Sequence, residues 1–170
     1  MKLTELFLAQ LEREADGTRD TLARVPEGRN EWRPHERSMP LGQLAALVAN
    51  LLGWIAMTIK TDEFVLGSGG ASKYSPRPLA TRAELMQSLE ESVRDAREAL
   101  KNTTDEHLTK PWRCIAGGQV VSEDARYIVL RDDVFSHLAH HRGQLTVYLR
   151  LNQMSALAAH ASSSDERKRA

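Results

Sequence analysis

The sequence has one cysteine, no excess of either charge and no long apolar run. The single Cys114 rules out an internal disulfide framework and fits a reducing compartment. Lysine and arginine together number 23, as do aspartate and glutamate, so the formal net charge is +0. This balance removes the general electrostatic argument for a nucleic acid or an acidic membrane surface as partner.

No segment reaches the roughly 18 apolar residues that a membrane-spanning helix needs. The most apolar stretch, Leu41 to Ile59, is interrupted by Gln43, Asn50 and Gly53. The N-terminal segment is amphipathic and acidic, unlike the basic start and apolar centre of a secretory signal. We therefore expect a cytoplasmic protein with no membrane partner.

Apolar residues recur at helical spacing in four stretches of the chain. With 170 residues, 41% of them hydrophobic, the chain is long enough for one domain with a sizeable core. The apolar stripes predict helices over about 4–23, from Pro40 to no later than Gly67, over 82–101, and over 127–151. We expect the second helix to bend near Gly53, and the third to begin with a capping box of Thr81 and Glu84.

Between the third and fourth helices, two short stretches with strand character flank a glycine pair. Residues 112–115 and 119–122 lie on either side of Gly117 and Gly118, which predicts a short hairpin. The predicted fold is therefore all-α: a four-helix bundle over residues 1–154 with a short β-hairpin before the last helix. Residues 155–170 are polar and charged, and we expect a disordered tail.

The last predicted helix carries three of the six histidines, His137, His140 and His141. Because His137 and His141 are four residues apart, both rings fall on one face of a helix, with Cβ atoms about 6 Å apart. Two imidazoles so placed can hold one divalent metal ion. The alternative is that they are surface or core histidines with satisfied hydrogen bonds. His140 either joins such a site or points away from it.

Two stretches resemble one known family. FSHLAHHRGQLTVYLRLN resembles the last helix, and EWRPHERSMPLGQLAALVANLLGW the loop and second helix, of the DinB/YfiT-like metalloenzyme family. The resemblance covers about residues 3–152. It implies a DinB-superfamily four-helix bundle in up-down-down-up order, often a homodimer, with a divalent metal held by one histidine on the second helix and two on the last. It further implies a metal-dependent hydrolase or a transferase using bacillithiol, mycothiol or glutathione.

Carried onto this sequence, the resemblance places the last-helix ligands at His137 and His141. The second-helix ligand position is occupied by Leu47, which cannot coordinate a metal. Nickel or zinc would then depend on water or another group, and His140, Asp133 and Arg142 are the accessory candidates. Arg142 is expected to pair with an acidic group across the bundle or the dimer, and the adjacent Gly143 is expected to allow close approach of helices.

Three hypotheses follow. The first is a metal-dependent enzyme, with a low-molecular-weight thiol as co-substrate, whose three-histidine site is incomplete. The second is a metal-free, non-catalytic dimer that has kept the bundle and acts as a binding or stress-associated protein; the motive for it is Leu47. The third, nucleic-acid binding, is opposed by the zero net charge. The sequence does not identify the small-molecule ligand.

Overall fold

The computed structural model describes residues 2–66, 79 and 81–152, which form four long helical segments and a small sheet. Residues 67–78 and the predicted tail at 155–170 lie outside these residues. In chain order the elements are α1 Leu3–Leu22, α2 Leu41–Asn50, α3 Gly53–Lys60, β1 Glu63–Leu66, α4 Arg82–Lys101, α5 Asp105–Leu108, β2 Pro111–Ala116, β3 Gln119–Ala125, α6 Arg126–Val129, η1 Leu130–Ser136 and α7 His137–Leu151.

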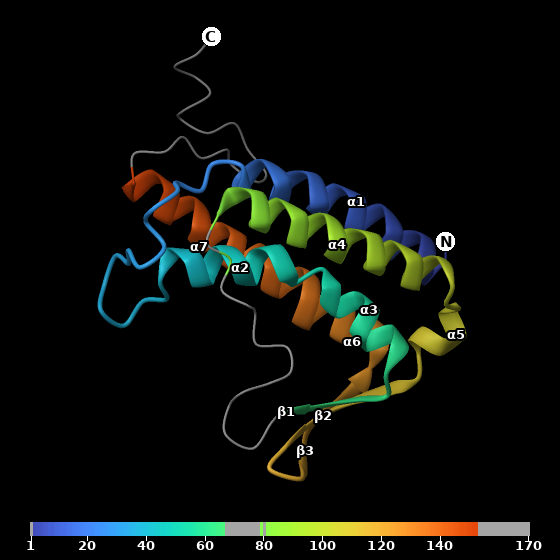
Figure 1. Ribbon diagram of the computed structural model, residues 1–170. Helices are drawn as coiled ribbons and strands as arrows, with labels where there is room; N and C mark the ends of the chain where they lie inside the picture. Colours follow the sequence, from blue (N-terminus) through green and yellow to red (C-terminus); the bar gives the residue numbers. More distant parts are fainter. Residues whose placement is uncertain (1, 67–78, 80, 153–170) are drawn as a thin grey trace.

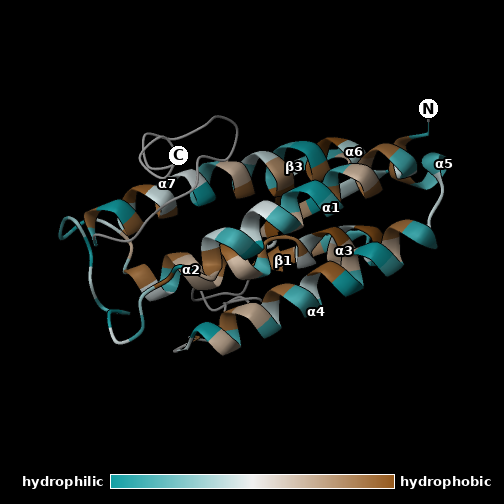
Figure 2. Cartoon of the chain, turned by 90° about the horizontal axis from the view of Figure 1, so that it is seen from above, coloured by the Kyte–Doolittle hydropathy of each residue, from teal (hydrophilic) through white to brown (hydrophobic). Residues whose placement is uncertain are grey.

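The predicted four-helix bundle is confirmed, including its up-down-down-up order. Figure 1 shows α1 and α7 running in one direction and α2, α3 and α4 in the other. The sheet lies at one end of the bundle, below α3 and α6. α4 packs against α1, α2 and α3, while α7 packs against α2 and α1. In Figure 2 hydrophobic and hydrophilic segments alternate along α1 and α4, as expected for helices with one buried face.

α1 begins at a side-chain cap supplied from far along the chain. Asp105 of α5 accepts hydrogen bonds from the backbone N–H groups of Leu3 at 2.8 Å and Thr4 at 3.0 Å. These are two of the donors that the first turn of a helix leaves without an intrahelical partner. The helix α5 itself was not predicted. Its Thr104 cap and its single turn connect α4 to the sheet and bring Asp105 to the start of α1.

The second predicted helix is divided into two shorter helices, α2 and α3. α2 and α3 meet at an angle of 49°, so the predicted bend near Gly53 is confirmed. A Cβ atom on Gly53 would lie 3.2 Å from Ser92 Oγ, so glycine allows α3 to approach α4 closely here. The chain leaves the helix at Thr61, which has extended backbone angles. Residues 63–66 form a strand, so the helix ends before Gly67, within the predicted limit.

The predicted capping box at the start of α4 is confirmed. Thr81 Oγ1 accepts a hydrogen bond from the Glu84 N–H at 3.2 Å, and Glu84 Oε2 accepts one from the Thr81 N–H at 3.0 Å. No single helix in the described part of the chain is long and apolar enough to span a membrane; only the bent pair α2 and α3, taken together, passes that test.

The predicted hairpin is confirmed as β2 and β3, which pair antiparallel around Gly117 and Gly118, both with positive φ. A third strand was not predicted. β1 pairs parallel with β2, with Glu63 opposite Arg113 and Leu66 opposite Ala116. The sheet order is therefore β1-β2-β3.

One buried arginine connects the sheet to the helical bundle through hydrogen bonds. Arg126 is 1% exposed, and its guanidinium donates to the carbonyls of Thr58 at 3.0 Å, Pro111 at 2.8 Å and Thr61 at 2.8 Å. It also contacts the Asp62 carboxylate at 2.5 Å. These contacts join the end of α3, the start of β2 and the start of α6.

The last helix is not uniform, which corrects the prediction of one regular helix over 127–151. Residues 126–129 and 137–151 are α-helical, but η1 between them is π-helical. Within it the Ser136 hydroxyl donates a hydrogen bond to the Arg131 carbonyl at 3.0 Å. Segments of π-helix within α-helices are frequent at functional sites, and this one ends at His137.

Candidate metal centre and adjoining pocket

His137 and His141 lie in contact at the start of α7. Their Nε2 atoms are 2.8 Å apart, and the ring centroids are 4.6 Å apart. The predicted placement of both rings on one face is therefore confirmed, because both residues fall in the regular α-helical part of the segment. Each ring is half-buried.

The ring of His141 is oriented by a second contact on its far side. His141 Nδ1 lies 2.8 Å from Gln144 Oε1. The amide oxygen can only accept, so this bond requires the proton on Nδ1 and leaves the lone pair of His141 Nε2 free to face His137. A histidine held in this way through its second nitrogen is the usual arrangement of a metal ligand.

The surroundings of His141 favour its neutral form. Burial lowers the pKa of His141 below its ordinary value, and the neighbouring His137 and His140 rings lower the pKa further, while the bond to Gln144 opposes them. Neutral imidazole is the form that binds metal. Neutral His141 can therefore offer its Nε2 lone pair to a cation without first losing a proton.

His140 is exposed and stands edge-on to His141, with ring centroids 5.0 Å apart. It lies beside the pair, and no contact with His137 is formed. The loop histidine His35 is exposed, and its Nδ1 accepts a hydrogen bond from the Arg37 N–H at 3.1 Å.

The third ligand position of the resemblance, Leu47, is half-buried on α2 and packs against the main core. The ring that approaches His137 is that of Trp54, edge-on at 5.8 Å between centroids. Among the described residues, no group of three or more His, Cys, Asp or Glu side chains could hold a metal ion. The histidine pair therefore offers two protein ligands.

A pocket of about 320 Å³ opens beside His137, between α3, the sheet and η1. Most of its wall is apolar. Its residues are Trp54, Met57, Thr58, Phe64, Leu66, Trp112, Cys114, Ser122, Val129, Asp133, Val134 and His137. Sequence reasoning identified only two of these as site candidates, His137 and Asp133. Trp54 is half-buried on the pocket wall.

Asp133 and Cys114 both line this pocket, and the pKa values of both are raised. Partial burial of the carboxyl raises the pKa of Asp133, and the nearby Asp132 and Asp124 raise it further, while His137 opposes them. Burial raises the pKa of the Cys114 thiol, and the Asp133 charge adds to this. A raised thiol pKa means fewer thiolates, so Cys114 is a poor nucleophile.

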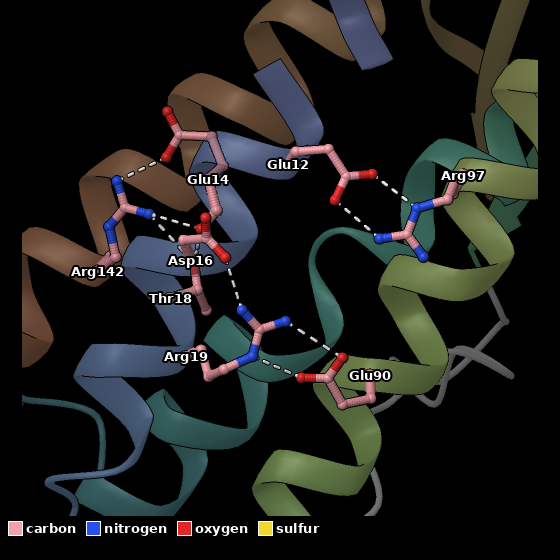
Figure 3. Close-up of polar contacts among 8 residues, drawn as sticks. All are labelled: Glu12, Glu14, Asp16, Thr18, Arg19, Glu90, Arg97 and Arg142. Atoms are coloured by element: carbon pink, nitrogen blue, oxygen red, sulfur yellow. Dashed lines mark hydrogen bonds and ion pairs between the residues drawn. The ribbon is translucent and has the colours of Figure 1, made fainter. Parts of the chain in front are cut away.

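The predicted pairing of Arg142 across the bundle is formed with Glu14 of α1 (Figure 3). Arg142 Nη2 lies 2.6 Å from Glu14 Oε2, and Nη1 donates to the Glu14 carbonyl and to Thr18 Oγ1, each at 3.1 Å. The two side chains are 3% and 12% exposed. Nη2 and Oε2 are in ion-pair contact but not in hydrogen-bond geometry, so Oε2, like Arg142 Nε, has no hydrogen-bond partner among the described residues. Arg142 therefore holds α1 to α7 and does not reach the histidine pair.

The expectation for Gly143 is wrong, because a Cβ atom there would meet nothing within 4 Å. The close approach is at Gly17 of α1, where a Cβ atom would lie 3.2 Å from Arg142 Nη1. The glycine that makes room for the buried arginine is thus on the opposite helix.

Comparison with solved structures identifies the fold. A DinB-like protein from Bacillus cereus ATCC 10987 is similar with a TM-score of 0.69 and 20% identity, covering 91% of this chain and 95% of that one. The chain has the DinB-like fold. A second DinB-like protein, from Bacillus subtilis, is similar with a TM-score of 0.66 and 17% identity, covering 92% of this chain and 98% of that one. No protein-family model and no curated protein matches the sequence. The DinB-like fold thus accounts for nearly the whole chain.

Proposed function

We propose that this protein is a member of the DinB family that binds one divalent metal ion, zinc or nickel, on His137 and His141. The observation that carries the proposal is the convergence of the two Nε2 atoms, 2.8 Å apart. Two nitrogens bonded to one tetrahedral ion at 2.0–2.1 Å are about 3.3 Å apart. Small rotations of the two rings would therefore admit an ion, and the bond from Gln144 already orients one of them.

The donor set makes this an open and comparatively weak site. A catalytic zinc ion normally has three protein ligands and a structural one four, whereas Leu47 leaves only the histidine pair. The remaining positions would be filled by water or by a ligand. An ion bound there would act as a Lewis acid on a coordinated water or thiol. Such chemistry agrees with the thiol-dependent transfer or hydrolysis that the resemblance implies.

The chain's own residues would supply the surroundings of that reaction. The apolar walls of the pocket beside His137 would hold the organic part of a substrate and exclude water from it. Trp54, edge-on to His137, would limit the directions in which that ring can turn. The Gln144 contact would keep His141 in the tautomer that presents Nε2.

Calorimetric titration of the untagged, metal-stripped protein with zinc and nickel salts tests the proposal. We expect one ion per chain, with binding lost in both His137→Ala and His141→Ala. His35→Ala is the matched control, because that histidine is exposed and contacts only its own loop. Equal binding by His137→Ala and the unsubstituted protein would contradict the proposal.

A second function is favoured by Leu47, a half-buried leucine at the position of the third ligand. A chain that has lost its ion but kept the bundle would act as a metal-free binding protein, as a homodimer if the resemblance extends to assembly. The same titration separates the two functions. If the protein is metal-free, titration with zinc or nickel salt should release no more heat from the unsubstituted protein than from His137→Ala.

A further inference from the structure

We infer that the pocket between α3, the sheet and η1 is a binding site for a small organic cation with an aromatic or aliphatic body, whose amine lies against Asp133. The pocket is formed by residues from four separate parts of the chain and has a volume of about 320 Å³. This is at the lower end of the range of about 300–1,000 Å³ typical of small-molecule sites. It suits a single ring with a short side chain.

The walls supply the affinity for an apolar or aromatic body. Trp54, Phe64 and Trp112 all line the pocket, from α3, β1 and β2. Trp112 is 5% exposed, and its indole N–H already donates to Thr61 Oγ1 at 3.2 Å, so its ring is fixed before any ligand arrives. Aromatic faces attract cations as well as apolar groups, because the face of the ring is negative.

A buried hydroxyl in the wall has no partner, which is the second and independent sign of a ligand. Thr58 is 1% exposed, and its Oγ1 has no hydrogen bond among the described residues, although it lines the pocket. Buried polar atoms in proteins are nearly always hydrogen-bonded, and leaving one unpaired costs about 1–3 kcal/mol. A ligand N–H or O–H entering the pocket would satisfy this hydroxyl.

The carboxylate of Asp133 in the pocket lining favours a positively charged ligand. No lysine or arginine of the described part of the chain pairs with Asp133, whereas its neighbour Asp132 is held by Arg131 at 2.8 Å. The other acidic group close to it is Asp124. An unpaired carboxylate beside aromatic walls is suited to an ammonium group, which gains a charge-assisted hydrogen bond there.

The pocket adjoins the metal centre, and His137 belongs to both. Neither His141 nor Leu47 lines it. Binding of an amine in the pocket therefore does not require an ion on the histidine pair, and the two proposals can fail independently.

The test is a calorimetric titration in the presence of EDTA, with three probes of similar size: 2-phenylethylamine, 2-phenylethanol and 3-phenylpropionate. We expect the amine to bind at least about tenfold more tightly than the alcohol, the ratio that one hydrogen bond to a charged group corresponds to. The carboxylate probe should bind most weakly. Fluorescence of the two pocket tryptophans, Trp54 and Trp112, should change with the same saturation curve.

Two matched variants locate the site. Asp133→Asn, which preserves side-chain shape, should reduce the affinity for the amine to that for the alcohol, whereas Asp132→Asn should leave it unchanged. Thr58→Val should weaken the binding of both the amine and the alcohol, because it removes the unpartnered hydroxyl while keeping the shape of the side chain. Equal affinity for amine and alcohol, an equal effect of both aspartate variants, or no binding of any probe at millimolar concentration would overturn the inference.

Discussion

Arg142→Ala is expected to be the most destabilising change at the polar contacts between helices. The residue is 3% exposed, and its guanidinium contacts the Glu14 carboxylate and donates to the Glu14 carbonyl and Thr18 Oγ1. Removing it leaves the Glu14 carboxylate, 12% exposed, without a counter-charge between α1 and α7. Breaking a buried ion pair from one side typically costs 3–5 kcal/mol.

We place the loss at the lower end, about 3 kcal/mol, because the pair is imperfectly satisfied. Arg142 Nε and Glu14 Oε2 have no hydrogen-bond partner among the described residues, so part of the desolvation cost is already uncompensated in the native protein. A domain of this size has a total stability of roughly 5–15 kcal/mol. The variant should therefore fold at low temperature with a much lower unfolding midpoint.

The matched control is Arg97→Ala, which removes an exposed arginine that also pairs with a glutamate of α1 (Figure 3). Arg97 contacts Glu12 through two hydrogen bonds of 2.7 and 2.8 Å, but the side chains are 37% and 51% exposed. Exposed pairs contribute about 0.2–1 kcal/mol. Figure 3 shows the Glu12 pair on the α4 side of α1 and the Glu14 pair on the α7 side, and the two pairs differ strongly in burial.

The assay is urea unfolding followed by circular dichroism, with Glu14→Leu/Arg142→Met as a rescue. The apolar pair should restore stability to within about 1 kcal/mol of the original or exceed it, because it removes both buried charges together. A loss in Arg142→Ala no larger than that in Arg97→Ala would refute the reasoning. So would a rescue variant as unstable as the single substitution.

Two further predictions concern helix stability. Gly143→Ala should stabilise the protein by up to about 1 kcal/mol through helix propensity, since nothing lies within 4 Å of the added Cβ. Gly17→Ala should destabilise the protein, because its added Cβ would lie 3.2 Å from the fixed Arg142 Nη1. Thermal unfolding of both variants tests this pair of predictions, and equal shifts in the unfolding midpoint would contradict them. The hydrogen bond from the Thr4 backbone N–H, and then that from Leu3, lower the pKa of Asp105. The ionised Asp105 carboxylate therefore stabilises the folded protein above the ordinary aspartate pKa of about 3.9, and this stabilisation is lost as the pH falls below that value. The difference in urea midpoint between the protein and Asp105→Asn should therefore shrink from pH 6 towards pH 3, and a constant difference would contradict it.

The helices could be predicted because each carries its own periodicity and end signals. The capping box at Thr81, the bend at Gly53 and the hairpin at Gly117 and Gly118 are local patterns, and all three are present in the structure. The π-helical turn of η1 was not predicted, because the apolar residues Leu130, Val134 and Leu138 follow one another at spacings of four, as in an α-helix. β1 was missed because its partner strand lies some fifty residues later in the chain.

One part of the candidate site could likewise be predicted from local spacing in the sequence, and the other part could not. His137 and His141 are four residues apart on one helix, so their contact follows from helix geometry. The pocket could not be predicted, since Trp54, Phe64 and Trp112 come from three different elements and meet only through the parallel pairing of β1 with β2. Long-range contacts of this kind leave no pattern in a single sequence.

Elemental analysis of the untagged protein beside Leu47→His and His137→Ala tests the central claim most directly. If the histidine pair is a two-ligand site, the original protein should carry metal only when zinc or nickel is supplied. Leu47→His should retain about one ion per chain through dialysis, because the third imidazole completes the site. His137→Ala should carry none under either condition. Metal that persists in His137→Ala, or a Leu47→His protein that gains no affinity, would contradict the assignment of the metal centre to His137 and His141.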